Sequence, residues 1–215
     1  MSHHNALLRR RFAGALAAVM LLAADAVAQT TTGSVLGTNQ APELAVTIQP
    51  GELVGHQQVM REFLRSGTNE FMFVVPEGLR TETAPDGMIM LITGDMSYYL
   101  SLRVVAPPPA GLDLKEALRK RIANQYAQVS NLQEFTTTVA DREGTGFQLR
   151  QELPKVGRRL IRILWVPFKA GVLEFALNAN NNNASAGQEA FDMIVLTFRS
   201  NERGRIEIVR HSDKT

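Results

Sequence analysis

The sequence predicts an α+β domain in which a mainly antiparallel sheet is flanked by helices on both faces. Many short segments with apolar or alternating side chains are separated by turn signals, as expected for strands joined by tight turns. Only two segments have clear helical periodicity, and at least two strands are apolar on both faces. Because such strands must be covered on both sides, we expect an α/β/α sandwich.

The first block of strands opens the predicted core. The apolar run Phe71–Val75 stops at Pro76-Glu77-Gly78, and residues 88–93 form a second apolar run. Side chains then alternate from Tyr98 to Val105 until three consecutive prolines, which cannot donate to a strand ladder, end the strand. The earlier segment 43–66 is ambiguous, because one stretch alternates and another has a four-residue spacing that favours a helical turn.

Two amphipathic helices are expected, one after each block of strands. The first spans about 114–129, with Asp113 as its N-cap and Glu116 three residues later in a capping box. The second begins at Ser185, which is paired with Gln188 in another capping box. Its apolar face has helical spacing and consists of Phe191, Ile194, Val195 and Phe198.

The second block of strands lies between the helices, and its strands are expected at residues 135–139, 147–153, 160–166 and 173–177. Gly144-Thr145-Gly146 is interpreted as part of a hairpin turn, because no helix follows it as one would follow a phosphate loop. Arg162 is the one charge in an otherwise apolar strand. It must therefore reach the end of the sheet or find a partner carboxylate.

Two local patterns resemble those of the PsbP-like fold family. Phe73-Val74-Val75-Pro76-Glu77-Gly78-Leu79 looks like the family's opening strand, which ends in V-P-x-G-W, with Leu79 in place of the aromatic residue. Phe191-Asp192-Met193-Ile194-Val195-Leu196-Thr197-Phe198 looks like the closing helix pattern F-D-x-I-x-x-S-F, with Thr197 in place of Ser. Together with the order of elements, the resemblance covers about residues 70–200 and implies the family's fold.

The resemblance also implies a mode of action. The family includes the PsbP subunit of photosystem II, periplasmic DcrB-type proteins and a Ran-binding import factor. Its members mostly bind other proteins and do not catalyse reactions. No functional residue of the family maps onto this chain, so the resemblance assigns no site.

The N-terminal residues have the pattern of a removable export signal. Arg9–Arg11 precede an apolar run that is too short to span a bilayer, and Ala26-Val27-Ala28 is a small-x-small cleavage site. We therefore expect an exported product, most simply periplasmic, with the extracellular medium as the alternative. The expected organisation is a signal peptide at 1–28, a flexible tether at 29–42, a single domain at 43–200 with its core at about 70–200, and a polar tail at 201–215.

Composition argues against several partners and chemistries. Residues 1–28 hold three of the 23 basic and one of the 21 acidic residues, so the remaining chain has 20 of each and no net charge to attract nucleic acid. The absence of cysteine excludes disulfides and thiol catalysis. Beyond the leader the histidines are His56 and His211, near opposite ends, and no familiar catalytic motif is present. We expect no catalytic, cofactor or metal site and no later transmembrane segment.

Three polar groups are candidates for an interaction surface. The first is an acidic loop with Glu77, Glu82 and Asp86. The second is a basic strand with Arg158, Arg159 and Arg162. The third is an Asn-rich loop with Asn181 and Asn182. Each group has a plainer alternative. The acidic group then forms a solvated loop, the basic group a solubilising rim around a core residue Trp165, and the Asn-rich group a strand-to-helix connection.

These observations favour an exported, non-catalytic interaction module, either an accessory or an assembly factor of the cell envelope. Its expected partner is another envelope protein. A small-ligand-binding envelope protein is the alternative and predicts a concave pocket near residues 77–86 and 178–183. An unrecognised hydrolase is a third hypothesis and predicts a histidine or a carboxylate pair in a cleft with mutual hydrogen bonds, the candidate histidines being His56 and His211.

Overall fold

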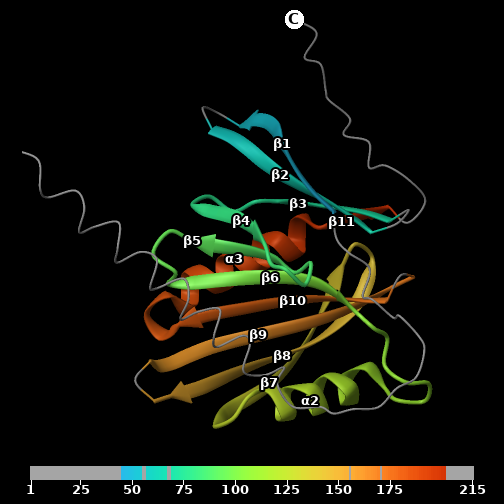
Figure 1. Cartoon of the computed structure of the whole chain (residues 1–215), viewed down its shortest axis with the longest axis vertical. Helices are drawn as coiled ribbons and strands as arrows, with labels where there is room; N and C mark the ends of the chain where they lie inside the picture. The colour runs from blue at the N-terminus through green and yellow to red at the C-terminus, as the bar shows by residue number, and fades with distance from the viewer. Residues whose placement is uncertain (1–44, 55–56, 67–68, 155, 170, 202–215) are drawn as a thin grey trace, which may run out of the picture. The chain divides into compact units, whose positions relative to one another are not determined.

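The computed structural model describes residues 45–54, 57–66, 69–154, 156–169 and 171–201, all within the compact unit Gln40–Thr215. These residues form two antiparallel sheets and two α-helices (Figure 1). The expected signal peptide, the tether, His56, His211 and the tail beyond residue 201 lie outside the described residues, so those expectations remain predictions.

The larger sheet has seven strands in the order β4-β5-β6-β10-β9-β8-β7. Every neighbouring pair is antiparallel, which confirms the predicted α+β class with mainly antiparallel pairing. The pair β6 and β10 joins the two sequence blocks. The strands are β4 (Leu79–Thr83), β5 (Ile89–Thr93), β6 (Tyr98–Val105), β7 (Val129–Val139), β8 (Arg142–Leu153), β9 (Gly157–Phe168) and β10 (Gly171–Asn180).

A second sheet has four strands in the order β1-β2-β3-β11. These strands are β1 (Ala45–Val54), β2 (Gln57–Ser66), β3 (Asn69–Val74) and β11 (Arg199–Asn201). The helical turn favoured near residues 59–64 was therefore wrong. A spacing of four residues is even, so it also places side chains on one face of a strand, and pairing with β1 and β3 decides between the two.

The helix α3 (Ala184–Thr197) lies between the two sheets, where it contacts β3 on one side and β6 and β10 on the other. The helix α2 (Leu114–Gln125) lies beside β8, at the β7–β8 end of the larger sheet (Figure 1). The predicted helical layer on both faces of one sheet is not shown. The second sheet makes α3 an interior element, because Phe71 and Phe73 of β3 cover the side of α3 that faces away from the larger sheet.

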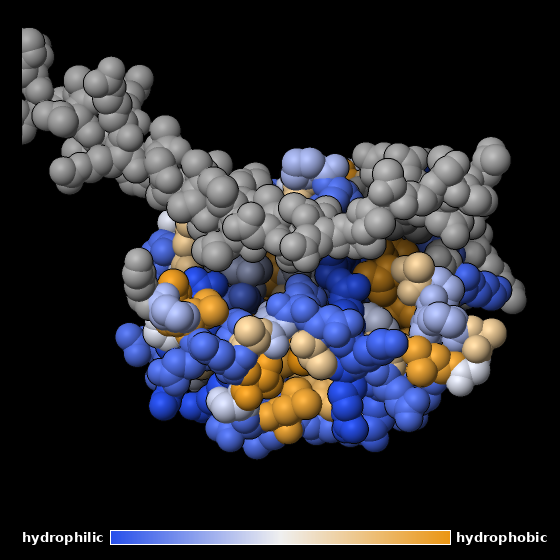
Figure 2. All heavy atoms as spheres, turned by 60° about the horizontal axis from the view of Figure 1, so that its bottom comes forward, coloured by the Kyte–Doolittle hydropathy of each residue, from blue (hydrophilic) through white to orange (hydrophobic). Residues whose placement is uncertain are grey.

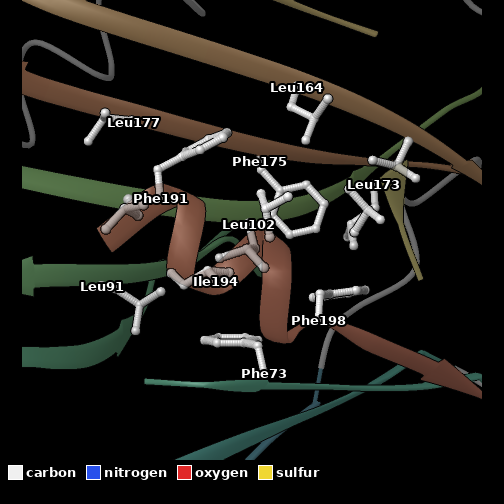
Figure 3. Close-up of a cluster of buried hydrophobic side chains, with 14 of the residues drawn as sticks. Phe73, Leu91, Leu102, Leu164, Leu173, Phe175, Leu177, Phe191, Ile194 and Phe198 are labelled. Carbon is white, nitrogen blue, oxygen red and sulfur yellow. The ribbon is translucent and has the colours of Figure 1, made fainter. Parts of the chain in front are cut away.

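Phe198, the residue after α3, is fully buried at the centre of the core between the sheets. Its ring stacks on Phe71 with centroids 5.6 Å apart and meets Phe175 edge-on at 5.0 Å. Figure 3 shows side chains from α3, β3 and the larger sheet meeting in this cluster. The apolar helix face predicted from Phe191 to Phe198 is therefore buried as expected.

Neither predicted capping box forms. Asp113 occupies the N-cap position of α2, but its side chain makes no capping hydrogen bond. Ser185 lies inside α3, where its hydroxyl donates to Glu189. The Asn-rich run instead forms the 3-10 turn η1 (Asn181–Asn183), and the Asn180 side chain accepts from the backbone N–H of Asn183. This turn starts the helical geometry before Ser185 is reached, so a cap at Ser185 is not needed.

The β7–β8 hairpin turns at Ala140 and Asp141, which have φ angles of 47° and 62°. The glycines expected in the turn lie inside β8 instead. A Cβ at Gly146 would lie 2.7 Å from the carbonyl oxygen of Ile163 and would overlap the ring of Phe135. The missing side chain therefore lets the Phe135 ring pack across the strand.

We expect Gly146→Ala to lower the free energy of unfolding by about 1–3 kcal/mol, because the added methyl overpacks the strand. Urea denaturation measures the change. Gly94→Ala is the matched control, since a Cβ there meets nothing within 4 Å. Equal stability losses in the two variants would contradict the packing role of Gly146.

Candidate functional site

A cluster of charged and aromatic side chains lies on one face of the larger sheet. The register places Arg103 of β6, Glu174 of β10 and Trp165 of β9 directly opposite one another across three neighbouring strands. Side chains in such a row point to the same face. Arg121 of α2 and Tyr126, which follows α2, complete what we call the Glu174 cluster.

Both carboxylate oxygens of Glu174 are engaged. Oε1 accepts a hydrogen bond from Arg103 Nε at 2.6 Å and lies 2.6 Å from Nη2 of the same guanidinium. Oε2 accepts from the indole Nε1 of Trp165 at 2.7 Å and forms an ion pair with Arg121 Nε at 3.2 Å. Glu174 is only 4% exposed, and these charge-assisted contacts compensate its burial.

The Glu174 cluster has one more positive than negative charge, because two guanidinium groups surround one carboxylate. Burial lowers the pKa of Arg121, while Glu174 acts in the opposite direction and Arg103 adds to the lowering. Burial also raises the pKa of the Tyr126 hydroxyl, and nearby Tyr99 and Glu174 raise it further. The excess positive charge is thus held where water screens it poorly.

The same face continues toward the other end of the strands. Tyr99 and Asn178 are directly opposite in the register of β6 and β10. The Asn178 side-chain oxygen accepts from Arg159 Nη1 at 3.2 Å, and the buried Arg159 Nε has no hydrogen-bond partner. Burial raises the pKa of Tyr99, whereas Arg159 and Asn178 act in the opposite direction. A third arginine therefore borders the Glu174 cluster.

The three candidate arginines do not form one surface. Arg158 is exposed and forms an ion pair with Glu152 at 3.2 Å. Arg159 is half-buried and points to the Trp165 face, which by alternation is opposite to that of Arg158 and Arg162. The basic candidates Arg158, Arg159 and Arg162 are therefore divided between the two faces of the sheet.

Arg162 finds the partner carboxylate that the sequence requires. Its Nη1 donates to Asp192 of α3 at 2.8 Å. The guanidinium also lies over the rings of Phe135 and Phe191, at 4.4 Å and 4.8 Å from their centroids. These contacts tie β9 to α3, so the structure gives Arg162 a packing role.

The acidic candidates lie at the β4 edge of the larger sheet. Glu77 is exposed in the turn after β3, and Glu82 on β4 forms an exposed ion pair with Arg80 at 3.0 Å. The Asp86 side chain accepts from the backbone N–H of Met88 and closes the β4–β5 turn. The predicted acidic loop is thus largely a strand. Three strands separate β4 from β9, a distance of about 19 Å between strand axes, so acidic and basic candidates do not meet.

Asn181 and Asn182 are exposed in η1, beside β9. A packing gap with no room for a water molecule lies elsewhere, in the core beside Phe175 and Phe191. None of its lining residues belongs to the loops 77–86 or 178–183, where the small-ligand hypothesis expects a pocket.

A further buried carboxyl group connects the two sheets. Glu62 of β2 is fully buried, and its Oε2 accepts from the hydroxyl of Thr81 on β4 at 2.7 Å. The other carboxyl oxygen has no hydrogen-bond partner. Burial raises the pKa of Glu62 to about 7, although the Thr81 hydrogen bond acts in the opposite direction.

Sequence reasoning missed the Glu174 cluster, although a signal was present. Arg103 and Glu174 are single charges in otherwise apolar strands, as Arg162 is. Charges that are isolated within two interior strands are expected to pair when those strands are neighbours. Only the β6–β10 pairing reveals that they are neighbours.

Across the described ranges, the structure contains no group of three or more His, Asp or Glu side chains that could hold a metal ion. Within the same ranges, neither α2 nor α3 has the length and apolar character of a membrane-crossing helix. Figure 2 turns the α2 end of the domain toward the viewer and shows mainly hydrophilic residues with small hydrophobic patches between them.

No protein-family model and no curated protein matches the chain. Among solved structures, cyanobacterial PsbP (CyanoP) from Synechocystis sp. PCC 6803 is similar with a TM-score of 0.42 and 14% identity, over 79% of this chain and 98% of that one. LpqN, involved in cell envelope biogenesis of Mycobacterium tuberculosis, is similar with a TM-score of 0.39 and 12% identity, over 73% of this chain and 91% of that one. The resemblance to PsbP stated from the sequence is thus found between structures, and at these identities it concerns the fold alone.

We expect Glu174→Ala to lower the free energy of unfolding by about 2 kcal/mol or more, because it leaves two guanidinium groups and a buried indole N–H without their acceptor. This expected loss of stability allows for solvent screening, since Arg103 and Arg121 are each about a third exposed. Urea denaturation measures the loss. The control Glu152→Ala breaks an exposed ion pair and should change stability by less than about 1 kcal/mol.

The raised pKa of Glu62 predicts a specific pH dependence. The folded domain binds this proton more tightly than the unfolded chain does, so stability falls as the pH rises from about 4.5 to about 7 and then levels off. The full loss is up to about 3 kcal/mol. Glu62→Gln should remove this part of the dependence and raise stability at alkaline pH. Unfolding curves on both sides of the window test this, with exposed Glu82→Gln as control; an unchanged slope in Glu62→Gln would contradict it.

Proposed function

We propose that this chain is an exported, non-catalytic interaction module of the cell envelope that works in the periplasm. The leader pattern of residues 1–28 supports export. The near-equal numbers of basic and acidic residues beyond the leader favour a protein partner over nucleic acid.

The state of the buried carboxylates carries the non-catalytic part of this proposal. A general base needs an oxygen that reaches the proton of a substrate. Both oxygens of Glu174 are occupied by donors, and Glu62 is sealed within the core. Glu70 is also buried and is paired with Arg65. These buried carboxylates therefore do not present a base to solvent.

Site-specific photo-cross-linking in the exporting cells tests the proposal. A photoreactive residue is placed separately at Glu82, Arg158, Asn181 and Met193, four exposed positions on β4, β9, η1 and α3. We expect one envelope protein to be captured from one of these surfaces and not from the others. Charge reversal beside the capturing position, such as Arg80→Glu next to Glu82 or Glu152→Lys next to Arg158, should then weaken the adduct while the urea midpoint stays near that of the wild type.

The matched control is a known envelope complex that is cross-linked in the same cells. Absence of an adduct at every position, while that complex is captured, would contradict an interaction module. Adducts of equal yield from all four positions would contradict it as well, because they would show random collision.

A further inference from the structure

We propose that the Glu174 cluster binds an oxyanion, a carboxylate or a phosphate group, between Arg103, Arg121 and Tyr126. This inference goes beyond the proposed function and does not depend on it, because the envelope partner can bind at another face.

The donors in the cluster outnumber its acceptors. Each guanidinium has five N–H groups, whereas the carboxylate of Glu174 offers about four lone-pair positions. Arg103 Nε and the Trp165 indole donate hydrogen bonds to this carboxylate, and Arg103 Nη2 and Arg121 Nε form ion pairs with it. Arg121 Nε lies 3.2 Å from Glu174 but without the geometry of a hydrogen bond. Further acceptors are therefore needed, and an oxyanion supplies several in one group.

The charges point to the same ligand. Arg103 and Arg121 together exceed Glu174 by one positive charge, and Arg159 adds another on the same face. Across the part of the chain that the structure describes, Glu174 is the one carboxylate that forms an ion pair with Arg103 or Arg121. A bound anion would balance the excess where partial burial makes the balance effective.

Exposure shows which groups a ligand can reach. The side chain of Glu174 is 5% exposed, whereas those of Arg103 and Arg121 are 29% and 32% exposed. The carboxylate is thus shielded from solvent and positions the two arginines, whose side chains are each about a third exposed. This order favours an anion over a cation, because the negative group is the one that a ligand cannot reach.

The type of donor limits the ligand further. Planar guanidinium groups bind carboxylate and phosphate oxygens in pairs, which a single-atom anion such as chloride cannot match. The half-buried Tyr126 packs against the apolar cluster that contains Trp165, and a tyrosine hydroxyl can donate a hydrogen bond at neutral pH, so it is a candidate further donor. We therefore assign the site to the oxyanion class rather than to anions in general.

Trp165 makes binding directly measurable. It is the chain's single tryptophan, its indole donates to Glu174, and the guanidinium of Arg121 lies 5.9 Å from the centroid of its ring system. The exported chain is titrated with sodium phosphate and with sodium succinate while sodium chloride keeps the ionic strength constant. We expect a saturable fluorescence change with a millimolar or lower Kd for at least one of the two, and calorimetry should give the same Kd. The tighter probe tells a phosphate-bearing ligand from a carboxylate-bearing one.

Arg121→Gln should weaken binding about tenfold or more, and Arg121→Lys should weaken it less, because the charge remains but the paired N–H groups are lost. Arg103→Gln is the second variant, provided that its urea midpoint shows a folded domain. Arg158→Gln is the matched control, since it removes an equal charge from the opposite face. No saturable binding of either probe, or equal weakening in Arg158→Gln and Arg121→Gln, would overturn the proposal.

Discussion

The position of Phe198 between two sheets is the constraint on which the fold depends. This one ring contacts four others, from both sheets: Phe71, Phe73, Phe168 and Phe175. The chain continues directly into β11, which pairs with β3, while Thr197 accepts a hydrogen bond from the backbone N–H of Val74. Burial of the aromatic ring and closure of the smaller sheet are therefore coupled, and either would be lost without the other.

The larger sheet combines this apolar core with a second face of different character. On the Trp165 face, apolar residues pack beneath α2, and Arg103 and Glu174 share a row with Trp165. Burying charge in this way is costly unless the partners are well placed, and the antiparallel register places them directly opposite. The same arrangement that satisfies Glu174 leaves the side chains of Arg103 and Arg121 about a third exposed. The proposed recognition chemistry thus follows from the way the sheet compensates its buried charge.

Much of the fold was predictable where the signal is local. Strands with strict alternation or long apolar runs, such as Tyr98–Val105, and the apolar face of α3 lie where the pattern places them. The errors occur where two structures share one pattern. The apolar residues at 59–64 fit the period of a helix as well as that of a strand. Ser185 was predicted to cap α3, but the turn η1 makes that cap unnecessary. The glycines near residue 145 were assigned to a turn, but they serve the packing of Phe135.

The sequence by itself determined the class of the domain, the positions of most strands, the face that α3 buries and the need for Arg162 either to reach the end of the sheet or to find a carboxylate. These properties follow from periodicity and from the cost of burying a lone charge, which act within a short segment. Only the tertiary structure decided that β1 and β2 belong to a second sheet, that Arg158 and Arg159 lie on opposite faces, and that Arg103 meets Glu174. Contacts between residues 71 positions apart depend on strand order, and strand order is set by the packing of the whole domain rather than by any local pattern.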